Sequence, residues 1–252
     1  MAPSLTPAQL LDAYTNVTNV TGQLRDAVLS VVENAWGELS SWREADIEAF
    51  VRQVTPVVAA GQRKVAAYTD AYLSQMEAMA TGQAIRPAGI PAEIVSSATM
   101  RGVPIEDVYR RLGPEVWTEL ANGRTLDQAV RTAGARATGM ARTDLQLAKT
   151  HATRYTLERS DNASGFLRAP DGDACELCLL ASEQVYSTGE LMPIHERCAC
   201  DVEPLFGGND RSASPTPDVT NPDDVEVDVE DHGELGPVLV VKGQNFTGPA
   251  DL

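Results

Sequence analysis

All four cysteines of the chain lie within 26 residues, together with one of its three histidines. They are arranged as Cys175-x-x-Cys178 and then, after sixteen residues, His195-x-x-Cys198-x-Cys200. A Cys-x-x-Cys turn presents two thiolates to one ion, and a second pair from a distant turn completes the tetrahedral shell of a structural zinc site. The spacing therefore predicts a structural Zn²⁺ site with ligands drawn from Cys175, Cys178, His195, Cys198 and Cys200.

The second half of the motif offers three candidates for the two remaining ligand positions. On a strand, Cys198 and Cys200 would point the same way. Either cysteine could then bind the ion, or both could, in which case His195 would be a hydrogen-bond donor beside the site.

Other cysteine chemistries compete with a metal. In a cytosolic chain disulfides are less favoured than a metal, and assembly outside a reducing cell would strengthen the disulfide alternative. A thioredoxin-like redox pair needs a βαβ context that this helical chain lacks. The cysteines also lie too close together to resemble a lone nucleophile served by a distant base. The sequence thus favours a structural module over a catalytic one.

The elements that must position this cluster are mainly helical. Capping signals, apolar residues three to four positions apart and Pro at helix starts predict a series of long and short helices over residues 1–160. Ser41-Trp42-Arg43-Glu44 is interpreted as a capping box, and Pro56 and Gly61 are expected to kink or divide the helix that follows. The expected helices span residues 7–39, 42–81, 91–101, 104–112, 115–121 and 125–159.

The composition changes after residue 160, where Gly, Pro, Asp and Cys replace the helical pattern. We predict three parts: a helical domain over 1–160, a small metal-stapled α+β module over 161–207, and an extended acidic linker and tail over 208–252. The module has few large apolar residues and needs a staple. Chelation or Cys175→Ser should therefore unfold it and spare most of the helices. Within the tail, Pro237–Lys242 has high β-propensity and is expected either to dock as a strand on a neighbour or to fray.

The net charge of −16 arises mainly from the tail. Residues 1–200 hold 18 basic and 24 acidic side chains, whereas residues 201–252 hold two and twelve. This balance excludes a general nucleic-acid binder and disfavours a zinc-finger DNA binder, because duplex affinity depends on Lys and Arg. The sequence shows no apolar run long enough to span a membrane and no signal peptide, so we expect synthesis in a cytoplasm and no membrane partner.

One stretch is mildly basic. Residues 101–160 hold ten basic and seven acidic side chains, among them Arg131, Arg142 and Lys149. These side chains could form a solvated helix face, or they could contact an acidic protein surface or DNA through charge steering.

The cysteine-bearing run resembles the C-terminal module of the phage Mu F-like minor head proteins, particularly those of actinobacterial phages. The residues that carry this resemblance are Cys175-x-x-Cys178, Tyr186 and Pro193-x-His195-x-x-Cys198-x-Cys200. The segments 142–151 and 232–237 are also similar to parts of these proteins. Glu196 and Ala199 depart from the family pattern, which often has Pro or Asn after the histidine and a polar or basic residue between the last two cysteines.

The resemblance implies a minor head component of the virion that lies near the portal, is synthesised in the host cytoplasm, and acts in head morphogenesis or genome delivery. Its implied partners are the portal protein and, as a further candidate, the major capsid protein, with local contact to packaged DNA.

An enzymatic alternative comes from relatives that carry protease domains or are labelled capsid maturation proteases. The chain has neither Gly-x-Ser-x-Gly nor His-Glu-x-x-His. A zinc-module nuclease would need a histidine to spare, and if His195 binds zinc only His151 and His232 remain, both outside the module. We therefore expect no catalytic residue and no cofactor other than zinc, and keep the protease and the nuclease as alternatives.

Overall fold

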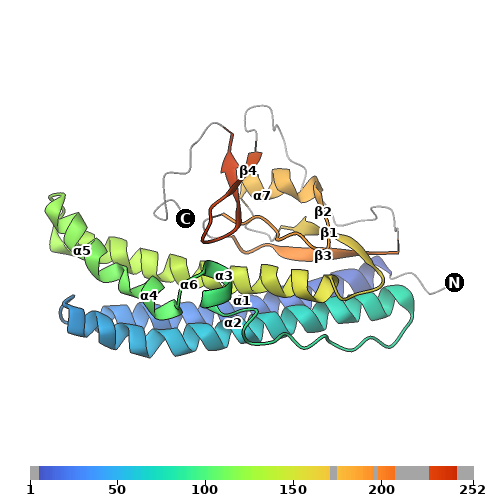
Figure 1. Ribbon diagram of the computed structural model, residues 1–252, viewed down its shortest axis with the longest axis horizontal. Coiled ribbons are helices and arrows are strands. Elements are labelled where there is room, and N and C mark those ends of the chain that lie inside the picture. The colour runs from blue at the N-terminus through green and yellow to red at the C-terminus, as the bar shows by residue number, and fades with distance from the viewer. Residues whose placement is uncertain (1–5, 171–174, 196–197, 208–226, 243–252) are drawn as a thin grey trace.

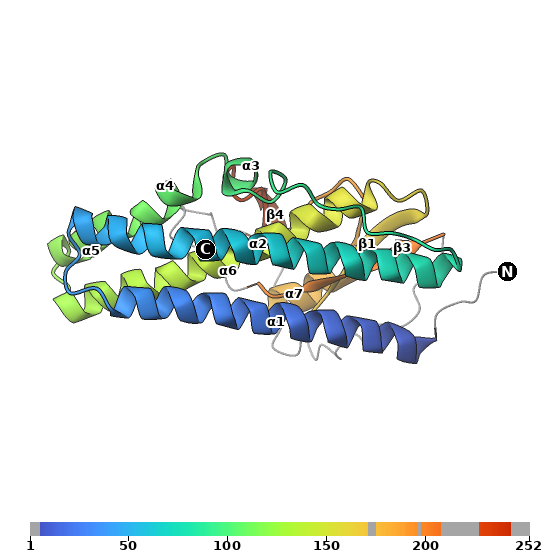
Figure 2. The ribbon, with the colours of Figure 1, turned by 90° about the horizontal axis from the view of Figure 1, so that it is seen from below.

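The computed structural model describes residues 6–170, 175–195, 198–207 and 227–242. Three long helices run side by side along the molecule: α1 (Pro7–Gly37), α2 (Glu44–Thr81) and α6 (Leu126–Leu157) (Figures 1 and 2). A small sheet region lies on one side of them, above α6 in Figure 1. This architecture confirms the predicted mainly α fold with a small α+β module.

Two of the long helices begin where their capping signals predict. Thr6 accepts a hydrogen bond from the Gln9 amide while the Gln9 side chain accepts one from the Thr6 amide, and Thr125 and Gln128 repeat the arrangement at α6. Each box satisfies donors that a helix start leaves unpaired.

The start of α2 differs from the prediction. Its N-cap is Arg43, which makes no capping bond, and the Ser41 hydroxyl instead donates a hydrogen bond to the Asp46 carboxylate. The proposed capping box is therefore wrong, because Ser41 lies two residues before the actual cap.

Pro56 and Gly61 were expected to kink or divide α2; the division is wrong, since one continuous helix contains both residues. Gly61 has a packing role instead. A Cβ there would lie 2.9 Å from side-chain atoms of both Val28 and Leu145. The missing side chain thus lets α1 and α6 approach α2 closely.

The segment between α2 and α6 forms shorter helices. These are α3 (Ser97–Arg101), α4 (Ile105–Arg110) and α5 (Leu112–Ala121). The helix predicted over 91–101 begins late, at Ser97, because the Ser96 side chain caps it and residues 92–95 form turns. Figure 1 shows α5 near the end of the bundle opposite the N-terminus.

The module contains a three-stranded antiparallel sheet. Its strands are β1 (Ala163–Ala169), β2 (Val185–Tyr186) and β3 (Asp201–Phe206), with β1 in the centre. A short helix, α7 (Glu176–Leu180), and a 3₁₀ turn, η1 (Ala181–Glu183), connect β1 to β2. The register pairs Phe166 with both Tyr186 and Pro204.

Part of the acidic C-terminal segment forms a second sheet, which has two strands. Strand β4 (Val227–Asp231) pairs antiparallel with β5 (Pro237–Val241), and β5 also bridges to Ile194 of the module. Residues 227–231, assigned from sequence to the linker, thus form a strand. The apolar segment at 237–241 pairs with β4 and with Ile194 of its own chain, so the expectation that it frays is wrong. The remaining linker and tail residues lie outside the described part of the chain.

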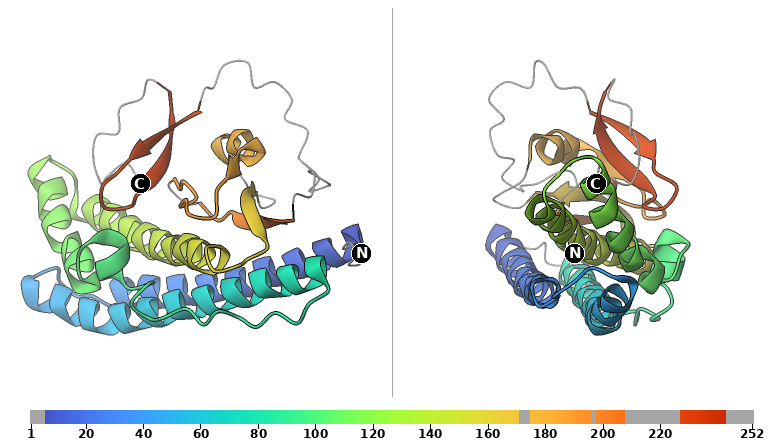
Figure 3. Two further views of the ribbon diagram at one scale, coloured as in Figure 1. Left: turned by 45° about the vertical axis from the view of Figure 1, so that its right-hand side comes forward. Right: turned by 90° about the vertical axis from the view of Figure 1, so that its left-hand side faces the viewer.

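The sheet region shares a hydrophobic core with the helices. One cluster joins helical residues to module residues, and Figure 3 shows the sheet resting on the long helices. The predicted domain boundaries at 160/161 and 207/208 stay predictions. The shared core shows that the module is stabilised by apolar residues of the helices as well as by its own. Buried members include Tyr72, Leu73, Met76, Leu147 and Ala148 from the helices and Phe166, Tyr186, Met192, Ile194, Val202 and Val238 from the strands and the loop before His195.

Candidate metal centre

Three segments bring the cysteine–histidine motif together. Cys175 is the N-cap of α7 and Cys178 lies within that helix. His195 directly follows the bridge residue Ile194, and Cys198 and Cys200 lie just before β3. The geometry considered from the sequence, with both cysteines on a strand, does not apply, because β3 begins at Asp201, directly after Cys200.

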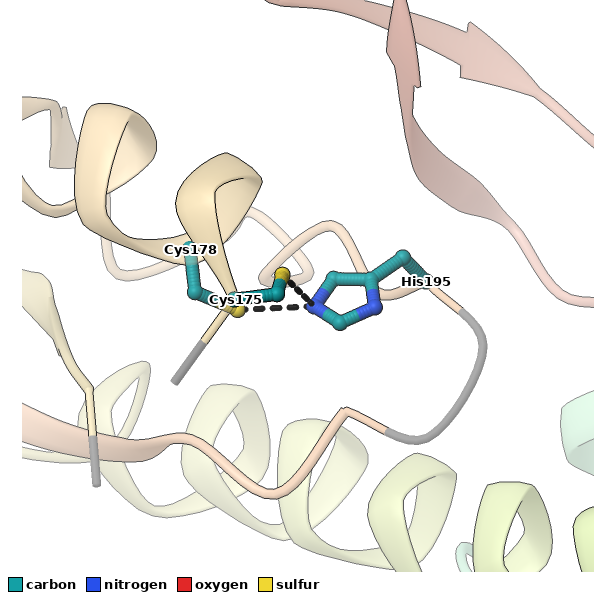
Figure 4. Close-up of side chains that lie close together, drawn as sticks. All are labelled: Cys175, Cys178 and His195. Atoms are coloured by element: carbon teal, nitrogen blue, oxygen red, sulfur yellow. Dashed lines mark hydrogen bonds between the residues drawn. The ribbon is translucent and has the colours of Figure 1, made fainter. Parts of the chain in front are cut away.

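The histidine ring lies against the Cys-x-x-Cys pair. His195 Nε2 is 3.2 Å from Cys175 Sγ and 2.8 Å from Cys178 Sγ (Figure 4). The three donor atoms lie within 4.8 Å of one another. Such a group can bind one metal ion, because a tetrahedral ion holds sulfur and nitrogen ligands at about 2.0–2.3 Å.

A second group shares Cys178 with the first. The sulfurs of Cys178, Cys198 and Cys200 also lie within 4.8 Å of one another, with Cys200 Sγ 3.0 Å from Cys178 Sγ. All five residues singled out from the sequence therefore meet in one place, around Cys178. All four cysteines are free thiols and not disulfides.

The three inner thiols influence each other's protonation. The pKa of Cys198 is lowered well below its usual value by hydrogen bonds with Cys178 and Cys200, and to a smaller extent by His195 and Arg168, although burial acts to raise it. The pKa of Cys178 is raised by its hydrogen bonds to Cys198 and Cys200 and by burial. The cluster thus favours negative charge on at least one sulfur, which is the form that binds metal.

A buried arginine that the sequence analysis missed lies directly against these sulfurs. Arg168 Nη1 is 3.4 Å from Cys178 Sγ and 3.5 Å from Cys198 Sγ, and Nη2 donates a hydrogen bond to the Pro193 carbonyl. Burial acts to lower the pKa of Arg168, but the neighbouring sulfurs outweigh it and the pKa is raised. The available signal was alternation on β1, where Phe166 and Arg168 share one face and both are buried.

The donor set fits a metal. Soft thiolates and an imidazole select zinc or a related transition metal over magnesium or calcium, which prefer oxygen. The cysteines and His195 could hold the ion, and a positive side chain beside them matches the negative charge that several thiolates would carry. Such an ion would join α7, the 194–200 segment and β3.

The centre is connected to the helical body by a second buried network. Lys149 Nζ of α6 lies 2.5 Å from Asp201 Oδ1, and Thr18 of α1 donates to Asp201 Oδ2 at 2.8 Å. Gln146 donates to the Cys200 carbonyl at 2.9 Å. The view of Lys149 as part of an exposed basic face is wrong, because the side chain is buried in this ion pair.

The other two histidines lie elsewhere. His151 is buried in α6, where burial, with a smaller effect of Arg154, lowers its pKa to about 4. His232 lies at the turn after β4, and its Nδ1 accepts a hydrogen bond from the Leu235 amide. The structure therefore places neither histidine in the cysteine cluster. Only His195 contributes an imidazole there.

A family model for the VG15 protein matches residues 6–223. The match covers most of the chain, so the chain belongs to this family, and membership indicates a phage-encoded protein. No match was found among curated proteins or among solved structures.

No helix in the described ranges combines the length and the apolar character needed to cross a bilayer.

Proposed function

We propose that this chain is a minor head protein of the phage Mu F-like type that associates with the portal vertex through protein–protein contacts. In this role it would contribute to head morphogenesis or genome delivery. One observation supports the proposal most strongly: the Cys-x-x-Cys and His-x-x-Cys-x-Cys parts of the motif lie together in the structure, around Cys178. That pattern is the most specific part of the resemblance, and the VG15 family match supports a phage origin.

The proposed cofactor is one structural Zn²⁺ ion held by four of the five donors Cys175, Cys178, His195, Cys198 and Cys200. Two three-donor groups that share Cys178 support this assignment. In this proposal zinc joins α7 to the segments that hold His195 and Cys198, in addition to the hydrophobic core that they already share. The role is structural, since four protein ligands leave no open position for substrate.

The proposed partner surface is the side of the bundle that carries Arg131 and Arg142 on α6. Arg131 is exposed and Arg142 is partly exposed. Lys149 is not part of this surface, because its side chain is buried in an ion pair with Asp201. Positive side chains here would favour an acidic patch of a portal ring, with the major capsid protein and packaged DNA as further contacts.

The deciding experiment mixes the full chain with assembled portal rings and sediments the rings. We expect the chain to co-sediment, and we expect the double variant Arg131→Glu/Arg142→Glu to co-sediment less at low salt. The matched control is Arg43→Glu, which reverses an exposed arginine at the N-cap of α2 and not on α6. Failure of the wild-type chain to sediment with portal rings would overturn the proposed partner.

The same samples test the enzymatic alternatives. Incubation with unfolded protein and with single- and double-stranded DNA should give no cleavage. Turnover that disappears in a Cys178→Ser variant would instead favour the protease or the nuclease.

A further inference from the structure

Among the residues that the structure describes, two arginines are buried, and they differ in what surrounds their charge. Arg101 Nε donates to Asp144 Oδ1 at 2.6 Å, and its Nη1 lies 3.6 Å from Glu234. Arg168 has no carboxylate partner within the described ranges; it interacts with the sulfurs of Cys178, Cys198 and Cys200 and donates to one backbone carbonyl. Both guanidinium groups keep their charge, because arginine is not deprotonated in proteins.

A buried charge is costly unless an opposite charge lies nearby. For Arg101 the compensating groups are evident. For Arg168, which is 2% exposed, the available negative charge is that of the cysteine sulfurs. The same cluster, when it binds a metal through three or four thiolates, carries a net negative charge that also needs compensation.

We propose that Arg168 is the built-in counter-charge and positioning residue of the metal–thiolate centre. This inference rests on the proposed zinc site. A zinc ion with three thiolates and one neutral imidazole has a net charge of −1, so a single guanidinium neutralises it. One arginine therefore matches a set of three cysteines and His195.

The geometry also gives Arg168 a positioning role. It projects from the central strand β1 and contacts sulfurs from two different segments, Cys178 of α7 and Cys198 before β3. Its bond to the Pro193 carbonyl lies two residues before His195. One rigid fork thus orients both halves of the donor set from a fixed strand, as residues behind metal ligands commonly do.

The experiment measures zinc affinity by competition with a chromogenic chelator for the full-length chain and three variants. Arg168→Met removes the charge and keeps much of the volume, Arg168→Lys keeps the charge but loses the fork, and Arg110→Met removes an arginine that pairs with Glu48 and Asp107 outside the centre. We expect Arg168→Met to weaken zinc binding about 10- to 100-fold. Arg168→Lys should retain an intermediate affinity, and Arg110→Met should match the wild type.

A second readout separates the electrostatic role from simple packing. The thiolate-to-metal charge-transfer bands of the Co²⁺-loaded protein should shift in Arg168→Met and shift less in Arg168→Lys. If Arg168→Met binds zinc as tightly as the wild type, the inference is overturned. Equal losses of zinc affinity in Arg168→Met and Arg168→Lys would also overturn the inference, since the shape of the arginine side chain, and not its charge, would then explain both losses.

Two further results are distinguishable. If the wild-type chain binds no zinc or cobalt, the proposed metal site itself fails, whatever Arg168 does. If Arg168→Met does not fold, Arg168→Lys is compared with Arg168→Gln, and the charged variant must bind zinc more tightly for the inference to stand.

Discussion

The backbone amide of Leu239 donates a hydrogen bond to the carbonyl of Ile194 at 2.7 Å, and the amide of Ile194 donates to the Pro237 carbonyl at 3.1 Å. Strand β5 therefore holds the residue that directly precedes His195. A segment from the acidic end of the chain is thus attached to the candidate metal centre through the backbone, and not only through side-chain packing.

This attachment predicts a local effect of metal removal. Chelation should free the 194–200 segment and with it the pairing to β5, whereas the core of α6 keeps its intrahelical bonds. Hydrogen exchange should accelerate at the amides of Ile194 and Leu239 and stay slow at Ala141. Equal acceleration at all three amides would show global unfolding, and no acceleration would show that no metal supports this segment.

The tip of the same hairpin is fixed to the helical body by charge. Glu234 accepts hydrogen bonds from Arg111 Nη1 at 3.0 and 3.2 Å and lies near Arg101, and its side chain is 18% exposed. Glu234→Gln should lower the opening free energy of β5 by about 1–2 kcal/mol, measured as faster exchange at Leu239. The control is Asp228→Asn on exposed β4, which should leave exchange at Leu239 unchanged. Similar effects of both substitutions would mean that general charge, and not this contact, matters.

Cys198 and Cys200 should differ in their contribution to metal binding. Both cysteines contact Cys178, each other and Arg168, but only Cys198 also contacts His195. We therefore expect Cys198→Ser to weaken zinc binding at least tenfold more than Cys200→Ser, in the same chelator competition. A larger loss in Cys200→Ser would assign the fourth ligand to Cys200 instead.

The buried His151 predicts a pH-dependent stability. Its pKa is about 4 in the folded protein, against 6.5 ordinarily, because burial disfavours the charged ring. Between these values the unfolded chain takes up a proton that the folded chain does not, so stability falls as the pH drops from 6.5 to 4. The loss reaches about 3 kcal/mol near pH 4.

His151→Gln should flatten this part of the profile, measured by urea unfolding at fixed zinc concentration. Loss of zinc at low pH affects both proteins, so the readout is the difference between their slopes. Parallel profiles would contradict the assignment.

The sequence was most informative where a feature depends on local chemistry. The capping boxes at Thr6 and Thr125 set two helix starts, and the spacing of the cysteines and His195 identified five residues that the fold brings together. The errors came from tertiary packing. The local sequence does not show whether Gly61 interrupts a helix or allows two helices to pack closely, and only the structure shows the second.

The same reason explains two missed charges. Arg168 and Lys149 resemble solvated side chains in sequence, and only the fold shows that they are buried beside sulfurs and beside Asp201. The partner of each lies at least ten residues away along the chain, where no pattern of spacing connects them. The hairpin of β4 and β5 was missed because an acidic segment has too little apolar surface to predict that it docks on its own chain.

Two glycines of α6 offer a matched test of how tightly the helices pack. A Cβ at Gly134 would lie 2.7 Å from Trp36 Cδ1 and 2.8 Å from its Nε1. The indole cannot easily retreat, because Nε1 donates to the Val130 carbonyl at 3.0 Å and the ring packs edge-on against Phe50. Gly134→Ala should therefore destabilise the protein by about 1–3 kcal/mol despite the better helix propensity of alanine.

Gly139 lies further along the same helix and faces open space, since a methyl group there would meet no atom of another described segment within 4 Å. Gly139→Ala should gain up to about 1 kcal/mol from helix propensity alone. Thermal or urea unfolding of the two variants should thus give changes of opposite sign. If Gly134→Ala were also stabilising, the Trp36 ring would have to move in the folded protein, and the close approach of α1 and α6 at this position would be refuted.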